Sequence, residues 1–377
     1  MKRFLLCLCL VSALIFPTFA NGEKEKTTAP AIVDETELSQ EDLIAAAQKE
    51  GKLVVYGTHS YIEKAAAAFQ EKYGIQVSWT QLGETDLIQK ISAECSSNAG
   101  GADLVYAQDG SRIKGEWINQ NYIYNWKSKR LGALTGNEDM SMSVFEYSCK
   151  AFIWNNELES DGKYLSNIWQ ITDPQYKGLF SMKDPYAEGV NFNFFTMLTS
   201  DENATKMAKA YKDYYGKDIA LTTPNAGYEW IKAAYKNGMI LGTSDTKISE
   251  EIGAKGQSVT RIGLFAVQRF ATAKVKNLAL AMNTGMDPYV GFYYPIYSII
   301  LKQSTHKNAA KLFVEFMLSE DGWQFWKNNV GDYSANKNLP YAGDISFDQW
   351  SKVAVLENMD FVYQNRVKVE DFIVGIN

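Results

Sequence analysis

The chain has 377 residues, of which 46% are hydrophobic and 22% charged, so it is long enough for two domains with their own cores. Its formal net charge of −6 argues against a nucleic-acid-binding protein, because binding a phosphate backbone requires a basic surface. The composition also excludes the collagen-like, coiled-coil and disordered classes.

The first twenty residues have the pattern of a secretory signal peptide. Lys2 and Arg3 precede an apolar run over residues 4–16, and Thr18-Phe19-Ala20 offers a cleavage site. We expect residues 1–20 to be removed, which makes the mature protein periplasmic or extracellular. The apolar run is short for a membrane span, and an uncleaved membrane anchor is the alternative.

Four cysteines bear on the compartment and on possible cross-links. Cys7 and Cys9 lie within the predicted signal peptide, where a lipid anchor on either of them is a further alternative. The exported protein would retain Cys95 and Cys149, whose separation permits a disulfide without implying one. Two cysteines cannot form a structural zinc site alone, so we expect both to behave as small apolar residues. Residues 21–50 are predicted to be a flexible leader followed by a first helix.

A β-α-β unit is predicted at the start of the folded region. Residues 53–56 form an apolar run typical of a buried strand, and Ser60 with Glu63 predicts a capping box at a helix start. Residues 75–79 follow as a second strand. In open α/β sheets, ligands bind beyond the carboxyl ends of the strands, where helix N-termini offer free N–H groups. The residues at that position are Thr58, His59 and Ser60.

The order of strand, polar turn and helix recurs in the first half of the chain. A loop over residues 82–86 leads into a helix for which Thr85 is the predicted cap. Residues 103–106 form a third strand, followed by a polar turn at 107–110. These turns add further polar residues to the same predicted binding edge: Gly83, Glu84, Thr85, Gln108 and Asp109.

An aromatic-rich run at residues 144–154 predicts a strand long enough to pass from one domain to another. Beyond it, the predicted strands at 178–182, 239–241 and 261–265 also end in polar turns. The polar residues that follow these strands are Asp184, Glu188, Thr243, Ser244, Asp245 and Gln268.

The last quarter of the chain is predicted to return to the first domain. A short apolar strand at 278–282 carries the chain back, and a core strand at 295–301 and an amphipathic helix at 308–318 follow. The tail after Ser319 is predicted to be helical, with one loop around residues 337–344.

Several short segments, taken in order, carry a family resemblance. They are Gly51-Lys-Leu-Val-Val-Tyr56, Phe69-x-x-Lys72-Tyr73-Gly74-Ile75-x-Val77, Gly101-Ala-Asp103-Leu-Val, Asp173-Pro174-x-Tyr176-Lys177-Gly178, Met182-x-Asp184-Pro185 and Asn308-Ala-Ala-Lys311-Leu-Phe313. Their order and spacing resemble the extracellular solute-binding proteins of ABC importers, the two-lobed class that includes the ferric-iron and hexose-phosphate binders. The similarity spans most of residues 51–330.

The resemblance implies an α/β fold of the two-lobed, type II periplasmic-binding-protein kind, in which each lobe is a mixed sheet flanked by helices and strands form the hinge. It places residues 51–147 and 282–327 in lobe one, and residues 148–281 and 328–377 in lobe two. It further implies a small-molecule ligand in the interlobe cleft, closure by hinge motion, and delivery to an ABC permease in the inner membrane. A monomer with no cofactor and no catalytic activity is expected.

Iron-binding members of this family carry adjacent tyrosines after the strand that corresponds here to residues 261–265. This chain has Ala266-Val267-Gln268-Arg269 instead, so the phenolate ligands for ferric iron are missing at that position. The substitute pairs are Tyr293-Tyr294, expected in a turn before a strand, and Tyr214-Tyr215, expected on a helix. Ferric iron is therefore kept as the alternative ligand.

The polar groups at the predicted strand ends fit a neutral or phosphorylated polyol. An anionic group is expected to bind helix N-termini together with Thr58, His59, Ser60 and Thr85. Sugar hydroxyls are expected to contact Asp184, Glu188, Asp245 and Gln268. The segment Thr243-Ser244-Asp245-x-Lys247 resembles the hexose-phosphate binders, so a sugar phosphate is the favoured ligand.

Simpler structural roles and a rival class stay open. Ser60 and Thr85 can be helix caps only, Asp109 can cap a helix beginning at Ser111, and Asp184 can serve a turn. An enzyme is the rival class, but the chain contains only two histidines and no Walker, Gly-x-Ser-x-Gly or Cys-x-x-Cys motif. A carbohydrate-active enzyme with paired carboxylates is the distant alternative, because such pairs carry no local signature.

Overall fold

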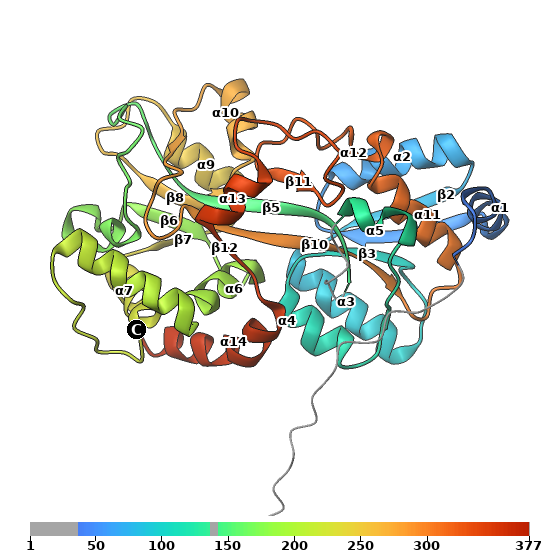
Figure 1. Cartoon of the computed structure of the whole chain (residues 1–377), viewed down its shortest axis with the longest axis horizontal. Helices are drawn as coiled ribbons and strands as arrows, with labels where there is room; N and C mark the ends of the chain where they lie inside the picture. The colour runs from blue at the N-terminus through green and yellow to red at the C-terminus, as the bar shows by residue number, and fades with distance from the viewer. Residues whose placement is uncertain (1–36, 136–141, 377) are drawn as a thin grey trace, which may run out of the picture.

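Two long strands, β5 (Ser143–Trp154) and β10 (Gly291–Leu301), lie side by side and antiparallel across the middle of the molecule (Figure 1). The computed structural model describes residues 37–135 and 142–376; the predicted signal peptide, its cleavage site and the leader up to residue 36 lie outside the described residues. Nearly every position of both strands is buried, as expected for the centre of a sheet covered on both faces. The long strand predicted at 144–154 is confirmed.

On one side of this pair lies a parallel layer in the order β2–β1–β3, which joins β10 by antiparallel pairing with β3. Its strands are β1 (Lys52–Gly57), β2 (Gln76–Gln81) and β3 (Leu104–Ala107). The helices of this half are α1 (Gln40–Glu50), α2 (Tyr61–Tyr73), α3 (Glu84–Ser97), α4 (Gly110–Arg112), α5 (Lys129–Thr135) and α11 (Lys307–Met317), with the π-helical turn η1 (Ile113–Ile118) and the short strand β4 (Ile123–Tyr124). The predicted β-α-β unit is confirmed.

On the other side, β5 pairs with β8 (Ile262–Ala266), and the sheet continues through β6 (Phe180–Lys183) to β7 (Ile240–Gly242). The surrounding helices are α6 (Gly189–Leu198), α7 (Asp201–Tyr215), α8 (Ala226–Lys236), α9 (Asp245–Gly253) and α10 (Arg269–Lys276), with the 3-10 turns η3 (Ile168–Thr172) and η4 (Pro174–Tyr176). The strand predicted at 278–282 shortens to β9 (Ala281–Met282), which pairs with the end of β5.

The C-terminal tail contains helices, as predicted, but also two short strands that were not predicted. Its elements are α12 (Glu320–Trp323), β11 (Asp332–Ser334), α13 (Phe347–Val353), β12 (Ala354–Leu356) and α14 (Met359–Val374). β11 pairs with β5, and β12 pairs with β10. Strands of three residues are too short to show an alternating pattern, and tertiary pairing decides their conformation.

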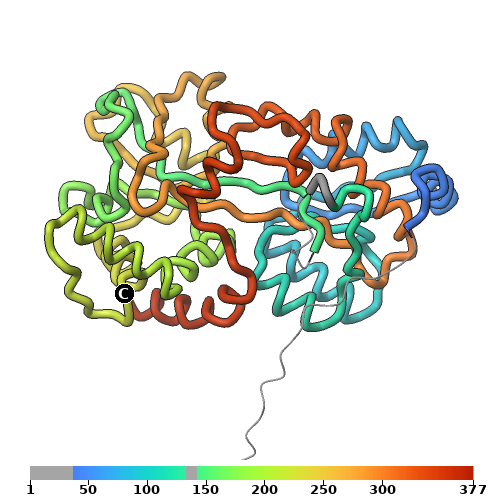
Figure 2. Tube along the Cα trace, viewed as in Figure 1, coloured from blue at the N-terminus to red at the C-terminus, as the bar shows by residue number. Residues whose placement is uncertain are grey.

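The last helix, α14, contacts both halves of the molecule. It packs against α6 and α8 on one side and against α4 and η1 on the other. In Figure 2 the chain descends from the central strands and then runs along the lower edge to the C-terminus. The tail therefore bridges the two halves at a place distinct from the central strands.

Two predicted helix caps differ from the structure. Ser60 precedes α2, but its backbone is helical (φ −59°, ψ −23°) and its side chain accepts no capping hydrogen bond, so the predicted capping box is wrong. Capping residues usually have an extended backbone that brings the side-chain oxygen over the first turn. α3 begins one residue before Thr85 and has Gly83 at its cap position, so Thr85 is not the cap.

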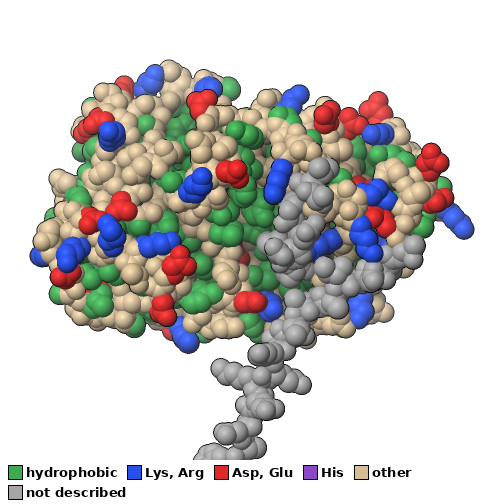
Figure 3. Space-filling view, viewed as in Figure 1, with side chains coloured by type: hydrophobic (Ala, Val, Ile, Leu, Met, Phe, Trp, Pro, Cys, Tyr) green, Lys and Arg blue, Asp and Glu red, His purple; other side chains and the backbone are tan. Residues whose placement is uncertain are grey.

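The surface shown in Figure 3 carries charges of both signs. Basic and acidic side chains are interspersed over this face. Cys95 and Cys149 are both free thiols; Cys149 is buried among apolar side chains, as expected for a small apolar residue, and Cys95 is partly buried against the main core. Within the described ranges, none of the helices is both long and apolar enough to cross a membrane.

Candidate functional site

A row of buried polar side chains lies on one face of the central strand β5. Glu146, Ser148 and Lys150 alternate along it and therefore point to the same side, and none is more than 1% exposed. The residues between them, Tyr147 and Cys149, belong to an apolar cluster on the opposite side. Charges buried in the middle of a sheet must be paired, so the partners of this row define a site.

The cation of the row, Lys150, is surrounded by acceptors from the half that contains β6 and β8. Its Nζ donates to the Glu188 carboxylate, lies 3.2 Å from Asp245 Oδ2, and lies 3.3 Å from Asn191 Oδ1. Burial alone would lower the pKa of Lys150, but the negative charges of Asp245 and Glu188 together have the larger effect and raise this pKa. Burial alone would raise the pKa of Glu188, but the positive charges of Lys150 and Lys183 together have the larger effect and lower this pKa.

The carboxylate of the row, Glu146, contacts the predicted site residue His59 from the other half. His59 Nδ1 lies 3.1 Å from Glu146 Oε1. Burial disfavours the imidazolium, but the bond to Glu146 raises the pKa of His59. Asp332 on β11 is bonded to Ser148 Oγ at 2.9 Å, and burial together with Glu146 raises the pKa of Asp332 to about 7.

Predicted site residues from the two halves touch directly. Gln108, after β3, donates from Nε2 to Glu188 Oε1 at 3.4 Å. The first backbone N–H of α6, at Gly189, donates to the Glu84 carboxylate, which comes from the first turn of α3. The strand ends of both halves therefore meet above the polar row of β5.

Glu84 is the least compensated charge of this group. Burial, followed by the nearby carboxylates of Asp109 and Glu188, raises the pKa of Glu84 to about 8. Its Oε1 accepts no hydrogen bond from the described part of the chain, and the same is true of Gln108 Oε1. The meeting point of the two halves therefore holds buried acceptors that lack donors.

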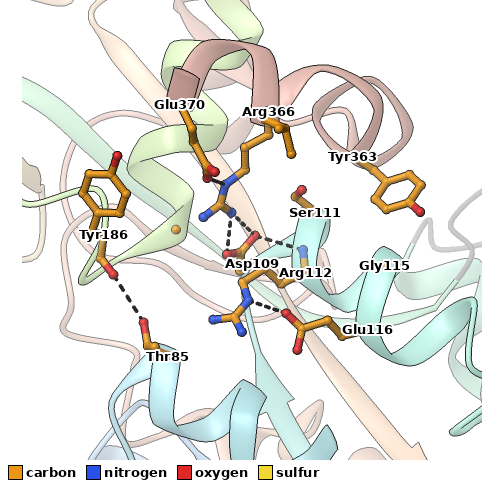
Figure 4. A pocket seen from close by; sticks show the side chains of 12 residues that line it. Thr85, Asp109, Ser111, Arg112, Gly115, Glu116, Tyr186, Tyr363, Arg366 and Glu370 are labelled. Carbon is orange, nitrogen blue, oxygen red and sulfur yellow. Dashed lines mark hydrogen bonds and ion pairs between the residues drawn. The ribbon is translucent and has the colours of Figure 1, made fainter. Parts of the chain in front are cut away.

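A second contact between the halves runs through α14. Arg366 Nη1 lies 2.7 Å from Asp109 Oδ2 and 2.9 Å from Oδ1, and its Nε donates to Glu370 at 2.7 Å. Figure 4 shows Arg366 reaching from α14 toward Asp109 at the start of α4, with Thr85 and Tyr186 on the other side of the pocket. This pocket has a volume of about 380 Å³ and lies where α3, α14 and the turn before α6 meet.

The remaining predicted site residues fall into two groups. Thr58, which precedes His59, has a buried Oγ1 without a partner among the described residues. Thr85 Oγ1 lies 3.4 Å from the Tyr186 carbonyl of the opposite half, and Asp184 accepts the Tyr186 N–H in a local turn. The residues that face away or serve local structure are Ser60, Gly83 and Thr243, which are exposed, Ser244, which caps α9, and Gln268, half-buried at the start of α10.

Several residues of the site were not predicted. Glu146 and Lys150 could have been recognised as charges at alternate positions of an otherwise apolar strand. Asp332 and Arg366 carry no such signal, because Asp332 lies on a short strand that the pattern did not reveal and the position of Arg366 depends on how α14 packs. The missed residues include most of the charge that balances the predicted ones.

The two tyrosine pairs considered for ferric iron do not form phenolate pairs of the kind expected. Tyr293 and Tyr294 lie within β10, not in a turn before it, so they point to opposite faces of the sheet. The hydroxyls of Tyr214 and Tyr215 both donate to Asp173. Among residues 37–135 and 142–376, no group of three or more His, Cys, Asp and Glu side chains is arranged to hold a metal ion.

Comparison with solved structures identifies the fold. Iron-bound HitA from Pseudomonas aeruginosa superposes with a TM-score of 0.66 at 17% identity, covering 86% of this chain and 99% of that one. The ferric binding protein from Campylobacter jejuni gives 0.65 at 16% identity, with 86% and 99% covered. The periplasmic binding protein AfuA from Actinobacillus pleuropneumoniae, with exogenous fructose-6-phosphate bound, gives 0.64 at 19% identity, with 86% and 98% covered. The predicted two-lobed periplasmic-binding-protein fold is confirmed.

The family follows from the sequence comparison. No curated protein matches the sequence. A family model described as bacterial extracellular solute-binding protein matches residues 64–352, which include the polar row of β5 and most of the predicted site residues. The chain belongs to the bacterial extracellular solute-binding proteins.

Proposed function

We propose that this protein is the exported solute-binding component of an ABC importer and that it captures a small polar ligand over the polar row of β5. The observation that carries the proposal is the convergence of Gln108 and Glu84 from one half with Glu188 from the other, above Lys150. A site assembled from both halves can enclose a ligand and report its presence by closing, which a permease can recognise.

The division into lobes is part of the proposal. Lobe one comprises residues 51–147 with 282–327, lobe two comprises residues 148–281 with 328–377, and β5 and β10 form the hinge between them. Small-angle X-ray scattering with and without ligand tests this. A smaller radius of gyration in the presence of a saturating ligand supports hinge closure, and an unchanged radius with a ligand of confirmed binding contradicts it.

A sugar phosphate is the favoured ligand. The unpartnered Thr58 hydroxyl and the imidazole of His59 supply donors for an anionic group, and Asp184, Glu188 and Asp245 supply acceptors for hydroxyls. The neighbour AfuA was solved with fructose-6-phosphate bound, which supports this class. Ferric iron is the second candidate, because the carboxylate oxygens of the cleft are hard donors and the neighbour HitA was solved with iron bound.

Calorimetric titration separates these candidates. The wild type, Thr58→Val and the control Thr205→Val, which alters an exposed hydroxyl on α7, are titrated with glucose 6-phosphate, fructose 6-phosphate, glucose and ferric citrate. Loss of one hydrogen bond to a charged group should weaken binding by roughly ten- to a hundredfold in Thr58→Val only. Tight binding of ferric iron with no binding of either phosphate overturns the favoured ligand.

Three further parts of the proposal have direct tests. N-terminal sequencing of the native protein should show a mature start at Asn21, whereas an intact Met1 contradicts cleavage. Light scattering after size exclusion should give the mass of a monomer. Incubation with a bound sugar phosphate and its re-isolation should return the ligand unchanged, and any turnover would favour the carbohydrate-active enzyme instead.

A further inference from the structure

Two buried side chains of one half, Glu84 and Gln108, contact adjacent residues of the other half, Gly189 and Glu188. Glu84 is 7% exposed and Gln108 is 3% exposed, and each places one oxygen where no donor of the described residues reaches it. Their other atoms are in use, because Glu84 accepts the Gly189 N–H and Gln108 donates to Glu188. Leaving buried acceptors without donors costs free energy, so a donor from outside the chain would relieve it.

The charge around these atoms indicates what kind of donor fits. Glu84 faces the carboxylates of Asp109 and Glu188. The nearby cations already have partners of their own: Lys150 and Lys183 pair with Glu188, and Arg366 pairs with Asp109. No cation pairs directly with Glu84 in the part of the chain that the structure describes, so with a pKa of about 8 its carboxyl is mostly protonated at pH 7, and a cation from outside the chain would stabilise the ionised form.

We propose that the ligand of this protein carries a protonated amine, which binds between Glu84 and Gln108. An ammonium group has three donors and no acceptor, so it satisfies both oxygens without presenting a lone pair to Glu188. A neutral hydroxyl does not stabilise the ionised carboxylate of Glu84 and forms no ion pair with it, and an anionic group at this point would disfavour ionisation further. The same ligand can carry a phosphate elsewhere, as an amino-sugar phosphate does.

This inference rests on the proposed function and refines the class of ligand. Matched pairs of compounds test it by calorimetry at pH 7: glucosamine against glucose, glucosamine 6-phosphate against glucose 6-phosphate, and 1,4-diaminobutane against 1,4-butanediol. The amine should bind about ten- to a hundredfold more tightly than its hydroxyl partner in at least one pair, which is the size of one charge-assisted hydrogen bond.

Glu84→Gln is the decisive variant, because glutamine keeps the shape and the acceptor for Gly189 but removes the carboxyl that ionises beside an ammonium. It should abolish the preference for the amine. The control is Asp86→Asn, which removes an exposed carboxylate from the same turn of α3 and should keep the preference. Circular dichroism and thermal melting of both variants show whether the fold is retained.

The possible results separate this inference from the proposed function. Equal binding of the amine and its hydroxyl partner in all three pairs overturns the amine and leaves the importer function standing. An amine preference that survives Glu84→Gln also overturns the assigned position. If no amine binds in any pair, the inference is wrong. Compaction by a ligand without an amine would still support the importer function in that case.

Discussion

Arg366 Nη1 lies within 2.9 Å of both carboxylate oxygens of Asp109, although the two residues are 257 positions apart in the chain. The pair joins α14 to the turn that follows β3. Asp109 is 1% exposed, and Asn193 from α6 donates to the same carboxylate at 3.1 Å. One buried charge therefore connects the C-terminal helix, the first half of the sheet and the second half.

Removing Arg366 should leave the Asp109 carboxylate buried with only neutral donors. We expect Arg366→Met to lower the free energy of unfolding by about 3–5 kcal/mol, the usual cost of breaking one side of a buried ion pair. Urea unfolding followed by tryptophan fluorescence measures this. Lys368→Met, which removes an exposed cation from the same helix, is the control, and an equal loss in both variants would contradict a special role for Arg366.

Lys150→Met should destabilise the protein in a pH-dependent way. Without the ammonium, Glu188 and Asp245 lose their common cation, and the free energy of unfolding at pH 8 should fall by about 3–5 kcal/mol. The loss should be smaller at pH 5, because the carboxyls can then bind protons in the folded state. Lys150→Arg keeps the charge and is the comparison. A loss independent of pH would indicate a packing defect instead.

Gly189→Ala should hold the two halves apart. A methyl group at Gly189 would overlap the Asp109 carboxylate of the opposite half, whereas one at Gly162 meets no atom within 4 Å. Scattering of Gly189→Ala should show a larger radius of gyration and weaker ligand binding than the wild type, while Gly162→Ala should show neither. Normal closure in Gly189→Ala would mean that the contact adjusts without separating the halves.

The closed arrangement should be favoured by mildly acidic pH. Burial, with Asp109 as neighbour, raises the pKa of Glu84 and Glu357 to about 8, while the usual value for an exposed glutamate is 4.5. Opening exposes such groups, so protonation stabilises the closed form. This stabilisation is complete at pH values below the pKa of an exposed glutamate and is lost as the pH rises toward 8. Glu188, which lies near Glu84, has a lowered pKa and stabilises the closed form only while its carboxylate is ionised. This stabilisation weakens as the pH falls below the usual pKa of a glutamate, which sets the lower limit of the pH window.

Scattering of the ligand-free protein tests this window. The radius of gyration should be larger at pH 8.5 than at pH 6, and a double variant with Glu84→Gln and Glu357→Gln should lose most of the difference. A radius that does not change with pH in the wild type would show that these carboxyls do not control opening.

Much of the fold could be predicted, because strands that end in polar turns can be recognised in short stretches of the sequence. Glu84, Gln108 and Asp109 were found through that order of strand, turn and helix, and the structure brings all three to the meeting point of the halves. Lys150 was missed because a lysine in a strand usually faces solvent. Only the pairing of β5 with β10 and β8 shows that its side chain is buried.

Other parts depend on contacts that no local pattern records. The helix caps at Ser60 and Thr85 were assigned from side-chain type, but the backbone conformation of Ser60 and the earlier start of α3 decided otherwise. Arg366 reaches Asp109 only after α14 has packed against α6. Long-range packing therefore determined the charge balance of the site, and local sequence determined its position.

The continuity of β5 has a consequence for how the molecule folds. The proposed boundary between the lobes falls between Tyr147 and Ser148, in the middle of a strand whose two ends belong to different layers of the sheet. Neither half retains a complete sheet if the chain is cut there, since residues 291–294 of β10 would lose the part of β5 with which they pair. We therefore expect the two proposed lobes to form one cooperative folding unit that melts in a single transition, and neither fragment to be a stable domain when expressed alone.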